Sequence, residues 1–325
     1  MSDQERSREE LQIGGQAVIE GVVMRGADRW ALAARRPCGE IFVDVNPVLT
    51  LARKHPRWNR FPIRGMFALA DSLIIGVKAL SISGGISLED VVESEADEPV
   101  VRESCDGKIK GERAAPVSTP QIAIALVIAF GLFFGLFVVL PAALAHQFDG
   151  VIDNTVVYNL IEGGIRITIF VLYLAAMSLI PDIRRVFMYH GAEHKAVHAY
   201  ESGAPMTVES AAKFSRAHVR CGTAFVLIVF VVSILAFSLM GRPALALRVL
   251  ERLVVIPFVA GFSYEIIKFA GKREDSRATK VLMAPGLLLQ KLTTREPDEA
   301  QLEVAILALE AAIGSAPDVA VAVKV

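Results

Sequence analysis

The sequence is poor in cysteine and in net charge, and each shortage excludes a class of protein. Only three cysteines are spread over 325 residues, which excludes a disulfide framework and favours a reducing compartment. The 34 Lys and Arg are matched by 35 Asp and Glu, so the basic excess of a nucleic-acid-binding protein is lacking. Residues 1–12 are rich in charged side chains, so we expect no cleavable signal at the start of the chain.

The chain does contain long apolar runs. Hydrophobic residues make up 53% of it and the mean hydropathy is +0.47, both high for a soluble domain. The 24 residues of 122–145 would form a helix of about 36 Å, enough for a hydrocarbon core of roughly 30 Å. Residues 221–241 are a second strong candidate, and 167–181 and 253–269 are weaker ones. We therefore expect four spans, the last with an acid inside it.

The charges of the loops predict how these spans are oriented. Residues 147–162 contain acids but no Lys or Arg, whereas residues 182–220 contain six basic residues. The positive-inside rule then places residues 182–220 and both termini in the cytoplasm. Three arginines before the fourth span, Arg242, Arg248 and Arg252, fit this rule less well.

The expected fold class is mainly α, a polytopic membrane helical bundle with a small N-terminal antiparallel β meander and a cytoplasmic C-terminal helix. The meander is predicted from the short runs 17–24, 30–34 and 40–45, which turn-forming residues separate. Residues 61–83 have a helical pattern interrupted by two charges. Such a helix suits a membrane surface or a packed position in the bundle better than a span.

Four segments follow one another in the predicted organisation. Residues 1–88 hold the meander and the membrane-associated helix, and 89–120 form an acidic flexible linker. Residues 121–270 form the transmembrane bundle with a cytoplasmic His-rich loop, and 271–325 form a cytoplasmic tail with an amphipathic helix. That last helix is predicted between Pro297 and Gly314, because its apolar residues share one face: Leu302, Ile306, Leu309 and Ile313.

The histidines are unevenly distributed, since four of the six fall within 29 residues: His190, His194, His198 and His218. A helix from Pro181 to about Gly203 would place the first three on one side, together with Glu193 and Glu201. Imidazoles at i and i+4 can both reach one divalent ion, and neutral imidazole is a common ligand of zinc. The cluster therefore predicts a metal site.

The order His-x-x-Glu-His is also that of the inverted zinc-peptidase motif, in which the glutamate is the general base toward metal-activated water. His190 and His194 would then be metal ligands and Glu193 the catalytic base. A zinc enzyme needs a third ligand. The candidates for this ligand are His198, Glu201, His218, Cys221 and Glu20.

A plainer interpretation stands beside this one. Residues 189–201 could form a solvated cytoplasmic helix whose His and Glu side chains pair with Lys195 and with lipid phosphates. His218 and Cys221, three residues apart, either share a metal or simply pack at the start of a span.

Two further segments carry polar residues in apolar surroundings. Residues 14–26 contain glycine pairs but lack the spacing of a phosphate-binding loop, so we expect the glycines to permit close backbone approach. Glu20 and Arg25 interrupt this apolar segment, and a functional role for them is left open. Glu265, inside a weaker span, is either part of a proton or ion relay or the partner of Lys268.

Three stretches together are similar to a known family: GGQAVIEGVVMRG at 14–26, YHGAEHKAVHAYE at 189–201 and HVRCGTAF at 218–225. They resemble the YqhQ-like family of bacterial membrane proteins, which are described as predicted metal-dependent enzymes of unassigned function. The tail 285–306 resembles that family too. The resemblance implies a protein of the bacterial inner membrane. It also implies a metal site drawn from His190, Glu193, His194, His198 and Glu201, supplemented by His218 and Cys221.

Two functions are therefore carried forward. The first is a membrane-embedded metal-dependent enzyme, with hydrolase as the class, a divalent metal, zinc first, as cofactor, and a substrate at the cytoplasmic face. Arg25, Arg64 or Arg220 would hold an anionic group of that substrate. The alternative is a non-catalytic membrane protein, that is, a metal sensor, a transporter component or a scaffold. Glu265 is nearly the only polar residue expected inside the spans, which weakens transport. The expected partners are the lipid bilayer and the substrate, with no nucleic acid.

Overall fold

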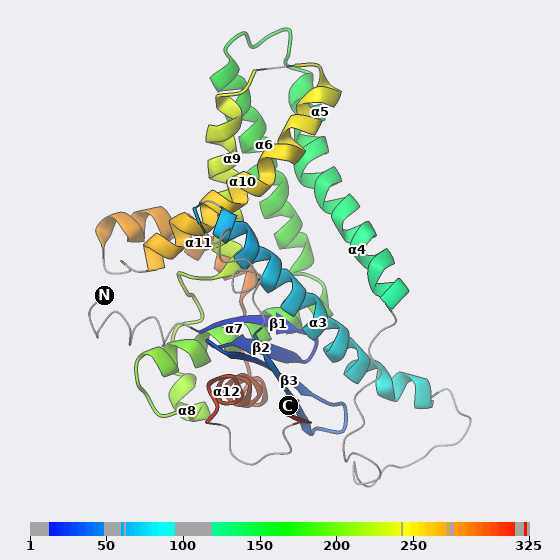
Figure 1. Ribbon diagram of the computed structural model, residues 1–325, viewed down its shortest axis with the longest axis vertical. Coiled ribbons are helices and arrows are strands. Elements are labelled where there is room, and N and C mark those ends of the chain that lie inside the picture. The colour runs from blue at the N-terminus through cyan, green and yellow to red at the C-terminus, as the bar shows by residue number, and fades with distance from the viewer. Residues whose placement is uncertain are drawn as a thin grey trace.

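The computed structural model describes residues 13–48, 60–61, 63–94, 119–241, 243–271, 273, 276–315 and 322–323. A helical bundle stands on a layer made of one β-sheet and the helices that cover it (Figure 1). The predicted class, mainly α with a small N-terminal antiparallel sheet, is confirmed.

The sheet is an antiparallel meander extended by one short parallel strand. Its order follows the chain, β1 (Gly14–Val18), β2 (Gly21–Arg25), β3 (Arg29–Arg35), β4 (Ile41–Pro47) and β5 (Ala322–Val323), with β5 parallel to β4. The predicted run 17–24 is in fact two strands, because the chain reverses at Ile19 and Glu20. Glu20 adopts a φ of 51° there, a left-handed conformation that tight turns between strands require.

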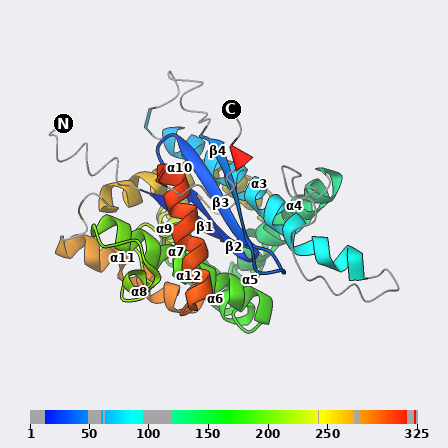
Figure 2. The same cartoon turned by 90° about the horizontal axis from the view of Figure 1, so that it is seen from below.

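Each face of the sheet is covered by helices, as the two-residue period of strand side chains allows. Met24 belongs to the cluster shared with α7 (Pro181–Glu201) and α12 (Glu299–Ile313). Val23, its neighbour, belongs to the cluster shared with α3 (Ile63–Ser94) on the opposite face. Seen from below, α12 lies across the strands (Figure 2). The sheet is thus the middle layer of three, and α7 is held against it.

The bundle above this layer is built from apolar helices. They are α4 (Thr119–Phe134), the π-helical turn η2 (Gly135–Val139), α5 (Leu140–His146), α6 (Thr155–Met177), α9 (Gly222–Ser238) and α10 (Leu245–Gly271). The short α8 (Val208–Ala211) follows α7, and α11 (Arg277–Thr293) packs beside α9. Among the described residues, three helices are long and apolar enough to cross a membrane: Ile63–Ser87, Pro120–His146 and Thr155–Met177.

The structure redraws the predicted spans. The run 122–145 lies within one of the three long helices, as expected. The helix predicted over 61–83 is itself long enough to be a span, and the weak candidate 167–181 belongs to the 23-residue α6. By contrast, 221–241 forms a helix of only 17 residues, at the lower limit for a span, and α10 is not among the three. The predicted helices are present, and the predicted number of four spans is not confirmed by the described residues.

The segments outside the bundle also show local differences. Residues 89–94 of the predicted linker continue α3, and residues 95–118 lie outside the described part. Helix α12 ends at Gly314 as predicted, with φ 81°, and begins with a capping box between Asp298 and Gln301.

Candidate metal site

Helix α7 carries the candidate site and has the predicted bounds. Pro181 occupies its first turn, where the missing N–H costs nothing, and the chain leaves the helix at Gly203, with φ 71°. The helix is not solvated: His194 is 2% exposed and Lys195 is 4% exposed. Lys195 donates to the carbonyl oxygen of Ala212 and pairs with Glu296. The plainer interpretation of a solvated helix facing lipid phosphates is therefore wrong.

Two glycines let neighbouring segments approach this helix closely. A Cβ atom on Gly191 would lie 2.1 Å from the carbonyl oxygen of Arg295, and one on Gly15 would lie 2.6 Å from Cγ of Glu193. Real Cβ atoms do not come so near to other atoms, so only glycine fits either place. The expected close approach around the 14–26 segment is thus present, and the group that approaches Gly15 is the predicted base.

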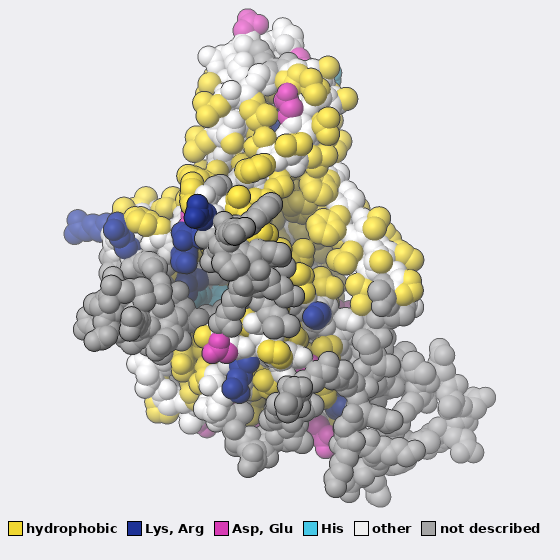
Figure 3. All heavy atoms as spheres, in the orientation of Figure 1, with side chains coloured by type: hydrophobic (Ala, Val, Ile, Leu, Met, Phe, Trp, Pro, Cys, Tyr) yellow, Lys and Arg dark blue, Asp and Glu magenta, His cyan; other side chains and the backbone are white. Residues whose placement is uncertain are grey.

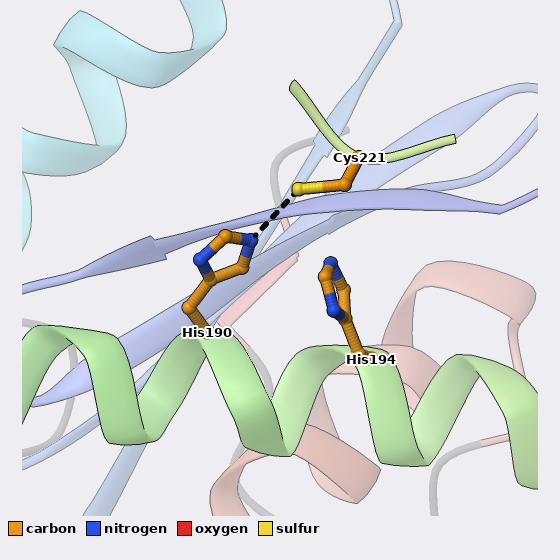
Figure 4. Close-up of side chains that lie close together, drawn as sticks. All are labelled: His190, His194 and Cys221. Atoms are coloured by element: carbon orange, nitrogen blue, oxygen red, sulfur yellow. Dashed lines mark hydrogen bonds between the residues drawn. The ribbon is translucent and has the colours of Figure 1, made fainter. Parts of the chain in front are cut away.

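Three potential metal ligands converge at the junction of α7, α9 and α11. One donor atom each from His190, His194 and Cys221 lies within 4.8 Å of the others. Figure 4 shows the two imidazoles standing side by side on α7 with the thiol above them. Cys221 is the N-cap residue of α9, and its Sγ is 3.2 Å from Nε2 of His190. Of the candidates for a third ligand, the structure brings Cys221 to the histidine pair.

The backbone fixes which nitrogen of each histidine faces this point. Nδ1 of His190 is 2.8 Å from the carbonyl oxygen of Thr293, and Nδ1 of His194 is 2.6 Å from that of Arg216. A carbonyl oxygen can only accept a hydrogen bond, so both Nδ1 atoms carry the proton. Each Nε2 of the neutral rings therefore keeps its lone pair. This arrangement of an outer acceptor behind each ring is usual for metal-binding histidines.

Glu193 lies beside the three donors. It is buried, and its Oε2 is 3.5 Å from Nε2 of His194. The carboxylate is held between this ring and the backbone of Gly15. A single water molecule could bridge the Glu193 carboxylate and the three potential ligands. A general base must lie this close to the water that it deprotonates.

The other polar residues of the predicted cluster form a second group next to the first. His198 donates from Nε2 to the carbonyl oxygen of Ala217, 2.9 Å away, and its ring is 4.6 Å from that of His218. Nε2 of His218 is 3.4 Å from Glu201, which also pairs with Arg220. Burial lowers the pKa of His198. These side chains form hydrogen bonds and ion pairs with one another and with the backbone, and they lie next to the three potential ligands.

Glu20 and Arg25 lie apart from the three donors. The carboxylate of Glu20 accepts two hydrogen bonds from Arg185 and one from Tyr189, so it ties the β1–β2 turn to the start of α7. The hydrogen bond from Arg185 to Glu20 raises the pKa of that guanidinium, and burial raises the pKa of Tyr189. Arg25 reaches Ser72 of α3 at 3.5 Å. Neither position adds a ligand to the cluster.

Glu265 has a partner, though not the predicted one. Nε of Arg64 on α3 is 2.6 Å from its carboxylate, and the two groups form a double hydrogen bond. The pair joins α3 to α10 at a point where Gly65 and Gly261 allow the helices to touch. Glu265 is thus an ion-pair residue, as one of the two alternatives had it, but its partner is Arg64 and not Lys268.

A group of charged residues that was not predicted lies inside the bundle. Glu162 and Arg166 of α6 and Arg248 and Arg252 of α10 are each at most 3% exposed. Glu162 forms ion pairs with Arg166 and Arg252, and Nε of Arg166 donates to the carbonyl oxygen of Phe137 in η2. The expectation that Glu265 is nearly the only polar residue inside the spans is therefore wrong.

This group extends towards the loop between α5 and α6. Arg248 donates to the hydroxyl of Tyr158 and to Asp149. Glu162 and Arg166 are four residues apart on α6, and Arg248 and Arg252 are four residues apart on α10. The two residues of each pair therefore share one face of their helix. This four-residue spacing was the signal in the sequence that could have indicated a buried group. The charges were instead assigned to the ends of spans and to the loops.

The fold and the site together define a membrane-type helical protein with a His/Cys cluster where its bundle meets a small sheet. A family model described as "Protein of unknown function (DUF1385)" matches residues 61–315. The chain is also 34% identical over 300 residues to the uncharacterized protein YqhQ of Bacillus subtilis (strain 168), which covers 90% of this chain and 89% of that one. It belongs to this YqhQ-like family, as the three stretches indicated. No solved structure matches.

Proposed function

We propose that the protein is a metal-dependent enzyme of the membrane, with a zinc site formed by His190, His194 and Cys221 and with hydrolysis as its reaction class. The observation that carries this proposal is the convergence of two lone-pair nitrogens and one thiol sulfur within 4.8 Å. Catalytic zinc sites have three protein ligands and leave a fourth position for water or substrate.

The donors suit zinc in kind and in spacing. Nitrogen and sulfur ligands are those that zinc prefers, and donors held 2.0–2.3 Å from one ion would be roughly 3.4–3.6 Å from each other. The Sγ–Nε2 distance between Cys221 and His190 is 3.2 Å, close to that spacing. The wider separations can close by small rotations of the side chains. Zinc bound there would polarise a substrate carbonyl or phosphoryl group and acidify water.

The roles of the surrounding residues follow from their contacts. The carbonyl oxygens of Thr293 and Arg216 hold the imidazoles in the tautomer that presents Nε2. Glu193 takes a proton from the attacking water at its carboxylate, because it lies beside the donors and is held there against Gly15. The buried surroundings exclude bulk water and strengthen each of these interactions.

The setting of the site is proposed as the cytoplasmic face of the bacterial inner membrane. The loop 147–154 contains two acids and no basic residue, whereas basic residues are frequent from 184 to 220, and by the positive-inside rule this difference supports a cytoplasmic location for 184–220. Arg248 and Arg252, which fitted this rule poorly as loop charges, are buried and paired within the bundle. They therefore cease to count against this orientation.

Metal analysis of the detergent-purified protein tests the donor set. We expect about one equivalent of zinc, lost in His194→Ala and in Cys221→Ser. Substitution of cobalt for zinc should give a thiolate-to-cobalt absorption band that Cys221→Ser removes. His146→Ala is the matched control, because this exposed histidine lies at the far end of the bundle and pairs with Asp149. Metal retained at one equivalent in both ligand variants would rule out this site.

Complementation of a deletion strain separates catalysis from mere binding. Glu193→Gln should retain the zinc and lose function, because the amide has no basic carboxylate oxygen for the proton. If Glu193→Gln keeps its metal and complements fully, the catalytic role is wrong. The protein would then be a metal sensor, a transporter component or a scaffold.

A further inference from the structure

Helix α11 has one buried and one exposed side, and within the part of the chain that the structure describes no other helix or strand packs on the exposed side. The helix runs across the long axis of the molecule and projects sideways from the base of the bundle (Figures 1 and 2). Its buried residues face α9: Thr279, Met283, Gly286, Leu289, Gln290 and Thr293. It is not one of the three helices that are long and apolar enough to cross a membrane. It lies at the level where the bundle meets the sheet layer.

The exposed side is divided lengthwise into an apolar edge and a basic edge. At 100° per residue, one edge carries Ala278, Val281, Leu282, Pro285 and Leu288. The other carries Arg277, Lys280 and Lys291, with Ala284 and the half-buried Leu287 beside them. Val281 is 75% exposed and Leu288 is 60% exposed. A contiguous row of exposed apolar side chains, unlike a single one, indicates a surface that contacts a partner or a membrane.

The charge of this region is of one sign. Residues 268–291 contain six Lys or Arg and two Asp or Glu, a net charge of +4 by subtraction, and α11 itself contains no acid. In the space-filling view the basic side chains gather at the outer end of this projection, beyond hydrophobic ones (Figure 3). A second copy of the chain would bring the same basic edge against its own, so self-association is disfavoured by like-charge repulsion.

We propose that α11 lies in the membrane surface on the side of the sheet layer, with its apolar edge among acyl chains and its basic edge on anionic lipid headgroups. Helices of this composition bind in the interface by buried apolar area together with attraction to anionic lipid. Lysine stems reach past the apolar edge so that the ammonium groups stay at the headgroups. The proposal rests on the membrane setting given above but not on the metal.

Depth-dependent quenching by brominated lipids in nanodiscs tests this placement. Val281→Trp and Leu288→Trp put a reporter on the apolar edge, and the signal of the chain's two native tryptophans is subtracted with the unchanged protein. Glu303→Trp is the control, because Glu303 lies on α12 with a side chain 54% exposed. We expect strong quenching at 281 and 288 and quenching of the control by aqueous acrylamide alone. Quenching at 281 and 288 no greater than in the control would overturn the proposal.

The anionic preference is measured by placing the bromine on an anionic or on a zwitterionic lipid at equal mole fraction. A basic residue near an anionic surface favours binding by roughly fivefold, so the anionic lipid should quench more. The double variant Lys280→Glu/Lys291→Glu should remove this preference. Equal quenching by the two lipids in the unchanged protein would overturn the assignment to anionic headgroups. Zinc content is measured on the same samples, so loss of the metal is distinguished from loss of lipid contact.

Discussion

Replacing Glu162 by Gln tests how far the buried charges hold the bundle together. Glu162 is 1% exposed and pairs with Arg166 and Arg252. The amide keeps the shape of the side chain but removes its negative charge, which leaves two guanidinium groups close together and uncompensated. Breaking a buried ion pair by removing one partner costs about 3–5 kcal/mol. We therefore expect the free energy of unfolding to fall by about that amount, a large share of the stability of a typical domain.

The measurement is equilibrium unfolding in detergent, followed by circular dichroism. Glu303→Gln is the control, because Glu303 pairs with Arg35 at 2.7 Å but is exposed, and such surface pairs contribute about 0–1 kcal/mol. The double variant Glu162→Gln/Arg252→Gln should be more stable than Glu162→Gln alone, since it removes one of the two unpaired charges. If Glu162→Gln unfolds within about 1 kcal/mol of the unchanged protein, the charges do not hold α6 to α10 as argued.

Two further predictions concern α7. Gly191→Ala should destabilise the fold by about 1–3 kcal/mol, because its Cβ would lie 2.1 Å from the carbonyl oxygen of Arg295; Gly164→Ala, where a Cβ meets open space, should show no such loss in the same unfolding assay. His198 has a pKa lowered by burial from its usual 6.5, so the unfolded state takes up the proton first. Stability is then present above about pH 6.5 and lost as the pH falls towards the folded-state pKa, with a slope of at most about 1.4 kcal/mol per pH unit. His198→Gln can still donate to Ala217 and should flatten that acid-side slope, and an unchanged slope would assign it to another group.

The parts of the fold that the sequence predicted are those set by local pattern. Helix α7 was located by Pro181 and Gly203, and its one-sided histidines were placed correctly because the 3.6-residue period leaves little freedom. The strands were located by alternation and turn residues, except at Glu20. A non-glycine residue with positive φ is uncommon. Because Ile19 and Glu20 are not typical turn residues, the sequence did not indicate a turn there.

The candidate site was predicted only in part, because its assembly depends on tertiary contacts. The pair His190 and His194 came from spacing within one helix. Cys221 stood among five candidates for the third ligand, and only a tertiary contact between the N-cap of α9 and His190 of α7 singles it out. The carbonyl groups that orient the imidazoles belong to Thr293 and Arg216, and backbone acceptors cannot be recognised in a sequence.

The predicted bounds of the spans were wrong where a charged residue was taken to mark the end of a span. Arg166 was taken as the boundary before the 15-residue candidate 167–181 and Glu162 as part of the loop 147–162, yet both lie inside the 23-residue α6. The cost of burying Glu162 is offset by Arg166 on the same helix and by Arg252, 90 residues away in sequence, and Arg166 also donates to the carbonyl oxygen of Phe137. Hydropathy assigns each charged residue its own cost of burial in the bilayer. It does not include an ion pair that offsets this cost when the partner is distant in sequence.

Helix α11 connects the two proposals, because its opposite sides touch different parts of the molecule. Its exposed side carries the apolar and basic edges assigned to the membrane surface. Its buried side supplies the carbonyl oxygen of Thr293 that orients His190 and the amide of Gln290 that holds the backbone of His218 by two hydrogen bonds. A rigid helix cannot move on one side alone. Any displacement of α11 by the lipid would therefore shift the acceptor that selects the tautomer of His190 in the proposed metal site, which would couple the membrane surface to that site through a single helix.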